Sequence, residues 1–92
     1  MIVRIMTEGQ FRMDDGDMER LNELDNACVA AVDGGDREGF QLAFAQLLAM
    51  VRQDGAPVPE EELVGSDVLV PPPDTSFEEA AADFTGDGLI PG

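Results

Sequence analysis

The sequence predicts an α+β fold in which a short N-terminal β-hairpin packs on an antiparallel two-helix hairpin. Two observations predict it. Two short β-prone runs flank a glycine-containing turn near the start, and two helical stripes of apolar residues follow with a short turn between them. A Pro-rich acidic linker and a short third helix are expected after the helices. Ninety-two residues make one domain with one modest core.

The β-hairpin is expected at the start of the chain. The runs Ile2–Met6 and Gln10–Met13 flank residues 7–9, and the glycine there favours the tight turn that joins antiparallel strands. In the second run Phe11 and Met13 alternate with polar residues, so one face of the hairpin is apolar. Because an isolated hairpin is marginal in water, this face must pack on the helices.

Two helices are expected over residues 17–33 and 37–53. The acids at positions 14–17 and at Asp36 precede them and favour N-terminal capping, and Gly34-Gly35 ends the first helix. Each helix carries an apolar stripe at helical spacing. The stripes are Met18, Leu21, Leu24, Cys28, Ala31 and Val32, with Glu19, Arg20, Glu23 and Asp25 mostly elsewhere, and then Phe40, Phe44 (or Ala43), Leu47, Leu48 and Val51.

Residues 1–92 are expected to form one domain with two segments of different character. Segment 1–55 holds the hairpin and the helix pair, and segment 56–92 holds the acidic linker, a short helix and a tail. Residues 67–70 can form a strand, but the triple proline at 71–73 stops any further pairing.

A short third helix is expected over residues 76–84. Thr75 and Glu78 have the spacing of a capping box, and the apolar face of the helix would carry Phe77, Ala80, Ala81 and Phe84. A helix of this length is unstable alone, so it must dock on its own domain or on a partner. The spacing favours its own domain and leaves the partner open.

The charge is strongly negative and unevenly spread. Twenty acids face five arginines, which gives −15. Residues 1–52 hold ten acids and all five arginines, a net charge of −5, whereas residues 53–92 hold ten acids and no base, a net charge of −10. Because no basic patch can neutralise phosphate, we expect no binding of nucleic acid or of anionic lipid. The charge favours a basic or mixed-charge protein surface, with solubility alone as the simpler explanation.

Catalytic chemistry has few residues to use. The chain has no His, Lys or Tyr, so the usual general bases near neutral pH and amine nucleophiles are missing. Cys28 lies in an apolar helical stretch and is expected to be a buried structural thiol. We therefore expect a protein that is not an enzyme, that needs no cofactor and that takes no small-molecule ligand.

A metal site is not expected either. Residues 83–90 resemble the start of an EF-hand loop, with Asp83, Thr85 and Asp87 at the first ligand positions. The glutamate that closes such a loop has no place before Gly92, so a helix end followed by a glycine-rich turn is the expectation. No thiolate–imidazole cluster exists for zinc.

Protein binding is the function class that these residues favour. Apolar and aromatic anchors surrounded by charge are typical of an interface. The candidate interface residues all lie in the second segment: Phe77, Phe84, Leu89, Ile90, Glu60, Glu61 and Glu62.

Several bland motifs occur in an order that spans the chain. They are the opening residues 1–12, two helices, Leu63-Val64-x-Ser66-Asp67 with Pro71-Pro72, and the ending Gly88-Leu89-Ile90-Pro91-Gly92. Together they resemble the PspA-associated (PspAA) proteins of actinobacteria and archaea. The resemblance implies a partner of PspA, a coiled-coil, membrane-remodelling protein of the phage-shock, envelope-stress system. It implies no catalytic residues, because the family has none assigned.

The resemblance further implies a role in modulating the assembly or membrane engagement of PspA. The longest apolar run is far short of the roughly 20 residues that span a bilayer. We therefore expect a cytoplasmic protein that reaches the inner face of the membrane only through its partner. The alternative is an acidic regulator, a nucleic-acid mimic or antitoxin-like protein that masks a basic surface. It needs a rigid, regular array of acids, whereas these acids cluster around a Pro-rich linker.

Overall fold

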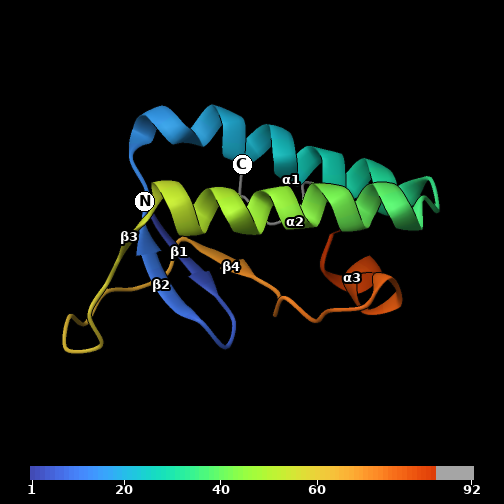
Figure 1. Ribbon diagram of the computed structural model, residues 1–92. Helices are drawn as coiled ribbons and strands as arrows, with labels where there is room; N and C mark the ends of the chain where they lie inside the picture. The colour runs from blue at the N-terminus through green and yellow to red at the C-terminus, as the bar shows by residue number, and fades with distance from the viewer. Residues whose placement is uncertain (85–92) are drawn as a thin grey trace.

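Two layers make up the molecule, which a computed structural model describes for residues 1–84 (Figure 1). A four-stranded sheet forms one layer, and two long antiparallel helices cover one face of it. The predicted α+β fold is confirmed. The elements are β1 (Ile2–Ile5), β2 (Gly9–Arg12), the 3-10 turn η1 (Asp15–Asp17), α1 (Met18–Asp33), α2 (Arg37–Asp54), β3 (Ala56–Pro57), β4 (Val68–Val70) and α3 (Phe77–Asp83).

The N-terminal hairpin forms as predicted. β1 pairs antiparallel with β2, and Ile5 lies opposite Gly9. The Glu8 N–H donates to the Ile5 carbonyl oxygen at 2.9 Å and closes the turn. Thr7 has a φ of 77° there, a left-handed conformation that β-branched residues rarely adopt. The turn therefore holds one strained residue, Thr7, two positions before Gly9, the glycine that the sequence indicated.

The sheet is larger than the hairpin that the sequence predicted. Its order is β3-β2-β1-β4, and β4 runs parallel to β1 with Val3 opposite Val68 and Ile5 opposite Val70. β3 pairs with β2 at the other edge. The strand expected at residues 67–70 is present, and Pro71 follows it directly. Both edge strands are very short and adjoin prolines, which limits pairing with further chains.

The helix pair is confirmed, with two corrections at the level of residues. Asp36 caps α2, because its Oδ1 accepts from the Gly39 N–H at 2.9 Å. The acids before α1 were expected to cap it, but Asp17 at the N-cap makes no side-chain capping bond, since η1 occupies this stretch. Asp25 was placed on the polar side of α1, yet it is fully buried. It shares one face with Leu21 and Cys28, at spacings of four and three residues.

The capping box of α3 lies one residue later than predicted. The Ser76 Oγ accepts from the Glu79 N–H at 3.1 Å, and the Ser76 N–H donates to the Glu79 carboxylate at 3.1 Å. The prediction that Thr75 and Glu78 form the capping box is therefore wrong, because the helix begins at Phe77 and its third residue is Glu79. The Thr75 N–H instead bonds the Pro72 carbonyl oxygen.

The core lies between the two layers and draws on both segments of the chain. Phe40 of α2 stacks on Phe44, with ring centroids 5.3 Å apart, and meets the edge of the Phe84 ring at 5.5 Å. β4, α3 and the C-cap residue that follows α3 add four buried apolar residues, namely Val68, Val70, Ala80 and Phe84. α3 thus packs on its own domain, against α1 and α2.

We predict that Phe84→Ala lowers the free energy of unfolding by about 3–5 kcal/mol, because it removes a fully buried ring from the core. Urea denaturation monitored by circular dichroism measures the change. Leu69→Ala is the matched control, since this β4 side chain is 56% exposed and its loss should cost about 0.5 kcal/mol or less. Equal effects of the two substitutions would contradict the docking of α3.

Candidate functional site

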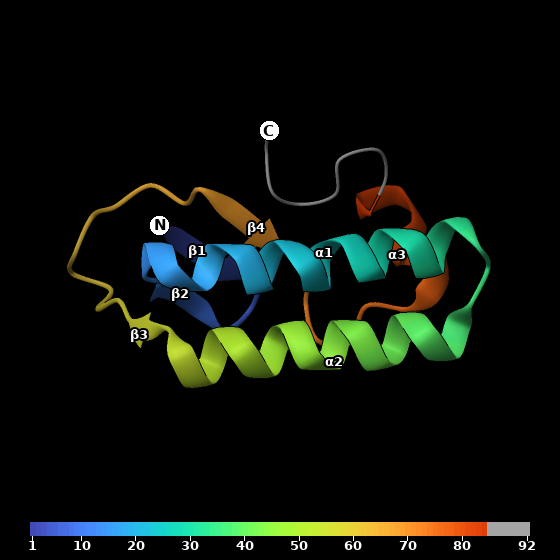
Figure 2. The same ribbon diagram turned by 90° about the horizontal axis from the view of Figure 1, so that it is seen from above.

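The predicted interface residues lie at two separate places. Glu60, Glu61 and Glu62 are exposed on the loop of residues 58–67, which connects β3 with β4. Phe77 and Phe84 belong to the α3 region, at the opposite end of the molecule in both views (Figures 1 and 2). The structure therefore does not bring the acids and the aromatic anchors together.

The two phenylalanines differ in their surroundings. Phe84 is fully buried and serves the core. Phe77 is half-buried, meets the edge of the Phe40 ring at 5.9 Å, and lies under the Arg37 guanidinium at 5.1 Å. Both rings thus pack on their own domain. The other predicted anchors, Leu89 and Ile90, lie outside the described residues.

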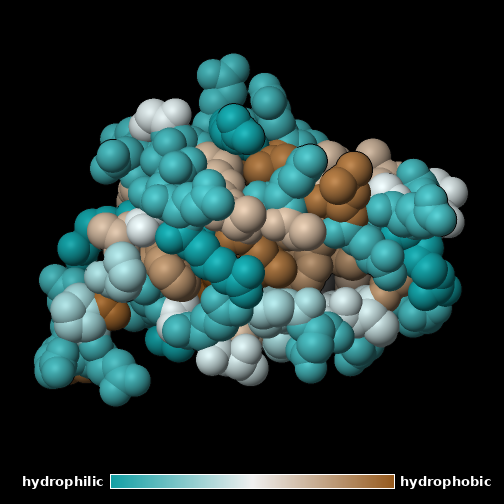
Figure 3. All heavy atoms as spheres, in the orientation of Figure 1, coloured by the Kyte–Doolittle hydropathy of each residue, from teal (hydrophilic) through white to brown (hydrophobic). Residues whose placement is uncertain are grey.

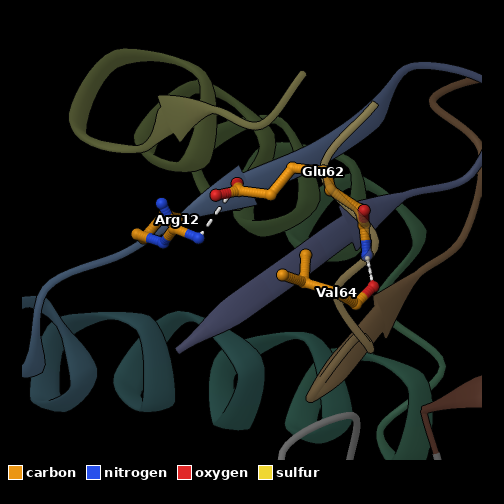
Figure 4. A network of polar contacts seen from close by, with 4 residues as sticks. Arg12, Glu62 and Val64 are labelled. Carbon is orange, nitrogen blue, oxygen red and sulfur yellow. Dashed lines mark hydrogen bonds and ion pairs between the residues drawn. The ribbon is translucent and has the colours of Figure 1, made fainter. Parts of the chain in front are cut away.

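The loop of residues 58–67 is fastened to the outer face of the sheet, away from the helices. The Gln10 amide nitrogen donates to the Val64 carbonyl oxygen at 3.0 Å and to the Ser66 hydroxyl at 2.9 Å. Arg12 of β2 pairs with Glu62 at 3.1 Å, and Figure 4 shows the two side chains reaching toward each other. The loop therefore has a defined path, although it has no helix or strand of its own.

Both ends of this loop are hydrogen-bonded as well. At its start the Val58 N–H donates to the Gln10 carbonyl oxygen at 2.9 Å. At its end Asp67 bonds Ile2 twice, since the Asp67 N–H donates to the Ile2 carbonyl oxygen at 2.8 Å and the Asp67 carboxylate accepts from the Ile2 N–H at 2.8 Å. A single turn lies between them, where the Glu62 N–H donates to the Pro59 carbonyl oxygen.

A hollow of about 330 Å³ lies between this loop and the sheet. Polar and apolar side chains share its lining, which includes Arg4, Gln10, Glu60, Glu62, Leu63 and Val64. The space is large enough for one or two side chains, but small for a cofactor. Three glutamates, Glu8, Glu60 and Glu62, line the hollow against one arginine, Arg4, and this excess of negative charge favours a positively charged occupant.

Leu63 was named in the sequence analysis only as part of a family motif and not as a candidate interface residue. Its side chain is 95% exposed, more than any other large apolar residue among those described. Apolar residues otherwise gather over the middle of the helical layer in the view of Figure 3, and the surface of the loop at lower left is mainly hydrophilic. The only signal in the sequence was a leucine directly after three glutamates.

Ion pairs hold two other parts of the surface. Arg52 of α2 donates from Nε to the Glu8 carboxylate at 2.9 Å and pairs with it through a second nitrogen. This hydrogen bonding lowers the pKa of Glu8. The pair therefore stabilises the folded chain above the unfolded pKa of a glutamate, and this contribution is lost as the pH falls through the lowered value. Arg37 pairs with Glu78 of α3 through one guanidinium nitrogen.

Cys28 has the surroundings of a structural thiol. It is fully buried in α1, and burial together with the nearby Asp25 carboxylate raises the pKa of the thiol to about 12. A thiol with such a pKa is almost fully protonated near neutral pH and is a poor nucleophile. Among residues 1–84 no group of three or more Cys, Asp or Glu side chains is placed to hold a metal ion.

These features define a small acidic α+β domain with two layers and a fastened acidic loop. The chain belongs to the PspA-associated protein family, since the family model described as PspA-Associated protein matches residues 1–92, the whole chain. No curated protein and no solved structure matches it. In the part of the chain that the structure describes, no helix is long and apolar enough to cross a membrane.

We predict that Cys28 of the native chain resists thiol reagents. The rise in its pKa from 9.0 to about 12 lowers the thiolate fraction at pH 8 by about 1,000-fold, and burial adds a steric barrier. The absorbance released by a disulfide reagent measures the rate in native buffer and in guanidinium chloride, where the reaction should be fast. Equal rates in the two solvents would contradict the buried position.

Proposed function

We propose that this chain is a non-catalytic partner of PspA and modulates the assembly or the membrane engagement of PspA in the envelope-stress response. The family match over the whole chain is the observation that carries the proposal. Association with PspA is what the family description states. Binding to PspA itself, and the consequence of that binding, are the steps that we add.

The residue types support binding rather than catalysis. The sequence offers no His, Lys or Tyr, and its single thiol is buried with a raised pKa. The carboxylates that remain are mostly exposed to solvent. General base or nucleophilic chemistry near neutral pH therefore has no suitable group among the residues described.

The charge supports a basic surface on the partner. The five acids of residues 53–67, Asp54, Glu60, Glu61, Glu62 and Asp67, have no base among them in the sequence, and the net charge of the chain is −15. Such a field repels anionic lipid and attracts lysine- or arginine-rich protein surfaces. We propose that the chain works in the cytoplasm and reaches the inner face of the membrane only when it is bound to PspA.

We predict that the purified chain binds purified PspA from the same organism, and that the affinity falls by about tenfold or more between 50 and 500 mM salt. The physical reason is that exposed charges are screened beyond about 10 Å at 0.1 M ionic strength. Isothermal titration calorimetry measures the affinity at each salt concentration. Absence of binding at 50 mM salt would overturn the proposed function.

Two further results separate the alternatives. If the affinity for PspA does not change with salt, the contact is not led by the acidic surface of the chain, and docking of PspA in an apolar groove takes its place as the explanation. Vesicles of anionic lipid should sediment the chain only when PspA is present, because a net charge of −15 opposes direct binding. Capture of basic nucleic-acid-binding proteins, without any affinity for PspA, would favour the acidic regulator that masks a basic surface.

A further inference from the structure

The loop of residues 58–67 combines an apolar anchor with acids on a fastened backbone. A single exposed leucine on a protein surface needs no explanation. Leu63 differs because three other features adjoin it: a hollow of about 330 Å³, a run of three glutamates, and a set of hydrogen bonds that fix the loop. The question is which partner surface fits all of these features.

The fixed backbone lowers the cost of using Leu63 as an anchor. Gln10 holds the carbonyl of the next residue, Val64, and Arg12 holds the side chain of the preceding residue, Glu62. The leucine is therefore presented between two tethered neighbours, with little loop entropy left to lose when a partner binds. Its exposure of 95% means that nearly the whole side chain is free for burial in a complex.

Within the part of the chain that the structure describes, only one of the three consecutive glutamates in the loop forms an ion pair. Glu62 is paired with Arg12, whereas none of the ion pairs among residues 1–84 involves Glu60 or Glu61. These two glutamates are exposed, and Glu60 also lines the hollow. A lysine or arginine from a partner would find free carboxylates there, and the apolar part of its side chain would fit beside Val64.

The other exposed apolar residues lack this combination. Leu42 of α2 is 63% exposed but does not line this hollow. Leu69 of β4 is 56% exposed but does not line this hollow. The loop is therefore where a strongly exposed leucine, glutamates that are unpaired among residues 1–84 and a hollow occur together.

We propose that Leu63, with Glu60 and Glu61, is the docking element for a basic protein surface that has a recess for one leucine side chain. The partner contributes a lysine or arginine that enters the hollow between the loop and the sheet. This inference rests on the proposed function, because it assigns the surface through which the chain binds PspA. The contact is made by the loop end of the molecule and leaves α3 on its own domain.

The test compares matched variants in titrations with purified full-length PspA. Leu63→Ser should weaken binding by about tenfold or more, because it removes an apolar group that binding would bury. The double variant Glu60→Gln with Glu61→Gln should weaken binding several-fold at 50 mM salt and should reduce its salt dependence. Leu42→Ser is the apolar control and should bind like the wild-type chain.

The charge control removes two acids elsewhere. Glu19→Gln with Glu23→Gln changes the net charge equally but acts on the exposed face of α1, and it should reduce the affinity by less than the double variant in the loop. Thermal denaturation checks that every variant is folded. Leu63 contributes almost no buried surface within the domain, so Leu63→Ser should melt like the wild-type chain.

The outcomes distinguish the inference from the proposed function. If wild-type binds PspA and Leu63→Ser binds within about twofold of it, the inference is wrong and the proposed function stands. Loss of binding in Leu42→Ser rather than in Leu63→Ser would likewise move the interface to the helix face and overturn the inference. If the wild-type chain itself does not bind, the proposed function fails, and the inference fails with it.

Discussion

The parallel pairing of β1 with β4 joins the two segments of the chain into one sheet. β1 lies between β2 and β4, and β2 pairs with β3 at the other edge, so each of the two inner strands holds a strand of the second segment. The pairing places Val68 and Val70 in the core and leads the chain toward Phe84, which packs on Phe40. It also fixes the far end of the loop of residues 58–67, whose near end is fixed by β3. The path and exposure of that loop therefore follow from the sheet topology.

The arginines fasten the acidic segment to the rest of the domain. Arg12 and Arg37 each pair with a glutamate about forty or more residues away in sequence, Glu62 and Glu78. Such exposed pairs contribute little to stability, so the apolar core holds the fold and the pairs select among arrangements of the loop and of α3. Because these arginines are already paired, the excess of acids is left to the solvent and to a partner.

Sequence reasoning reached the parts of the fold that depend on local pattern. The helix pair and the hairpin follow from periodicity and from glycine positions, which neighbouring residues fix. The pairing of β4 with β1 and that of β3 with β2 join residues far apart in the sequence, so no short-range pattern reveals them. The capping box was misplaced by one residue because Thr75 and Ser76 are both capping residue types and both Glu78 and Glu79 follow them. Asp25 was misplaced because a polar residue in a buried position interrupts the apolar stripe.

The candidate site likewise has features that the sequence reveals and features that only the folded structure reveals. The run Glu60–Glu62 is visible in the sequence as charge, whereas the exposure of Leu63 is decided by the hydrogen bonds from Gln10 and by the two anchored ends of the loop. The two residue types also act at different ranges. Carboxylates attract a basic partner over about 10 Å and govern the rate of encounter, whereas an apolar anchor acts only on contact and governs dissociation. An acidic loop with one fastened leucine can therefore combine fast, salt-dependent association with a specific geometry, which acids alone would not supply.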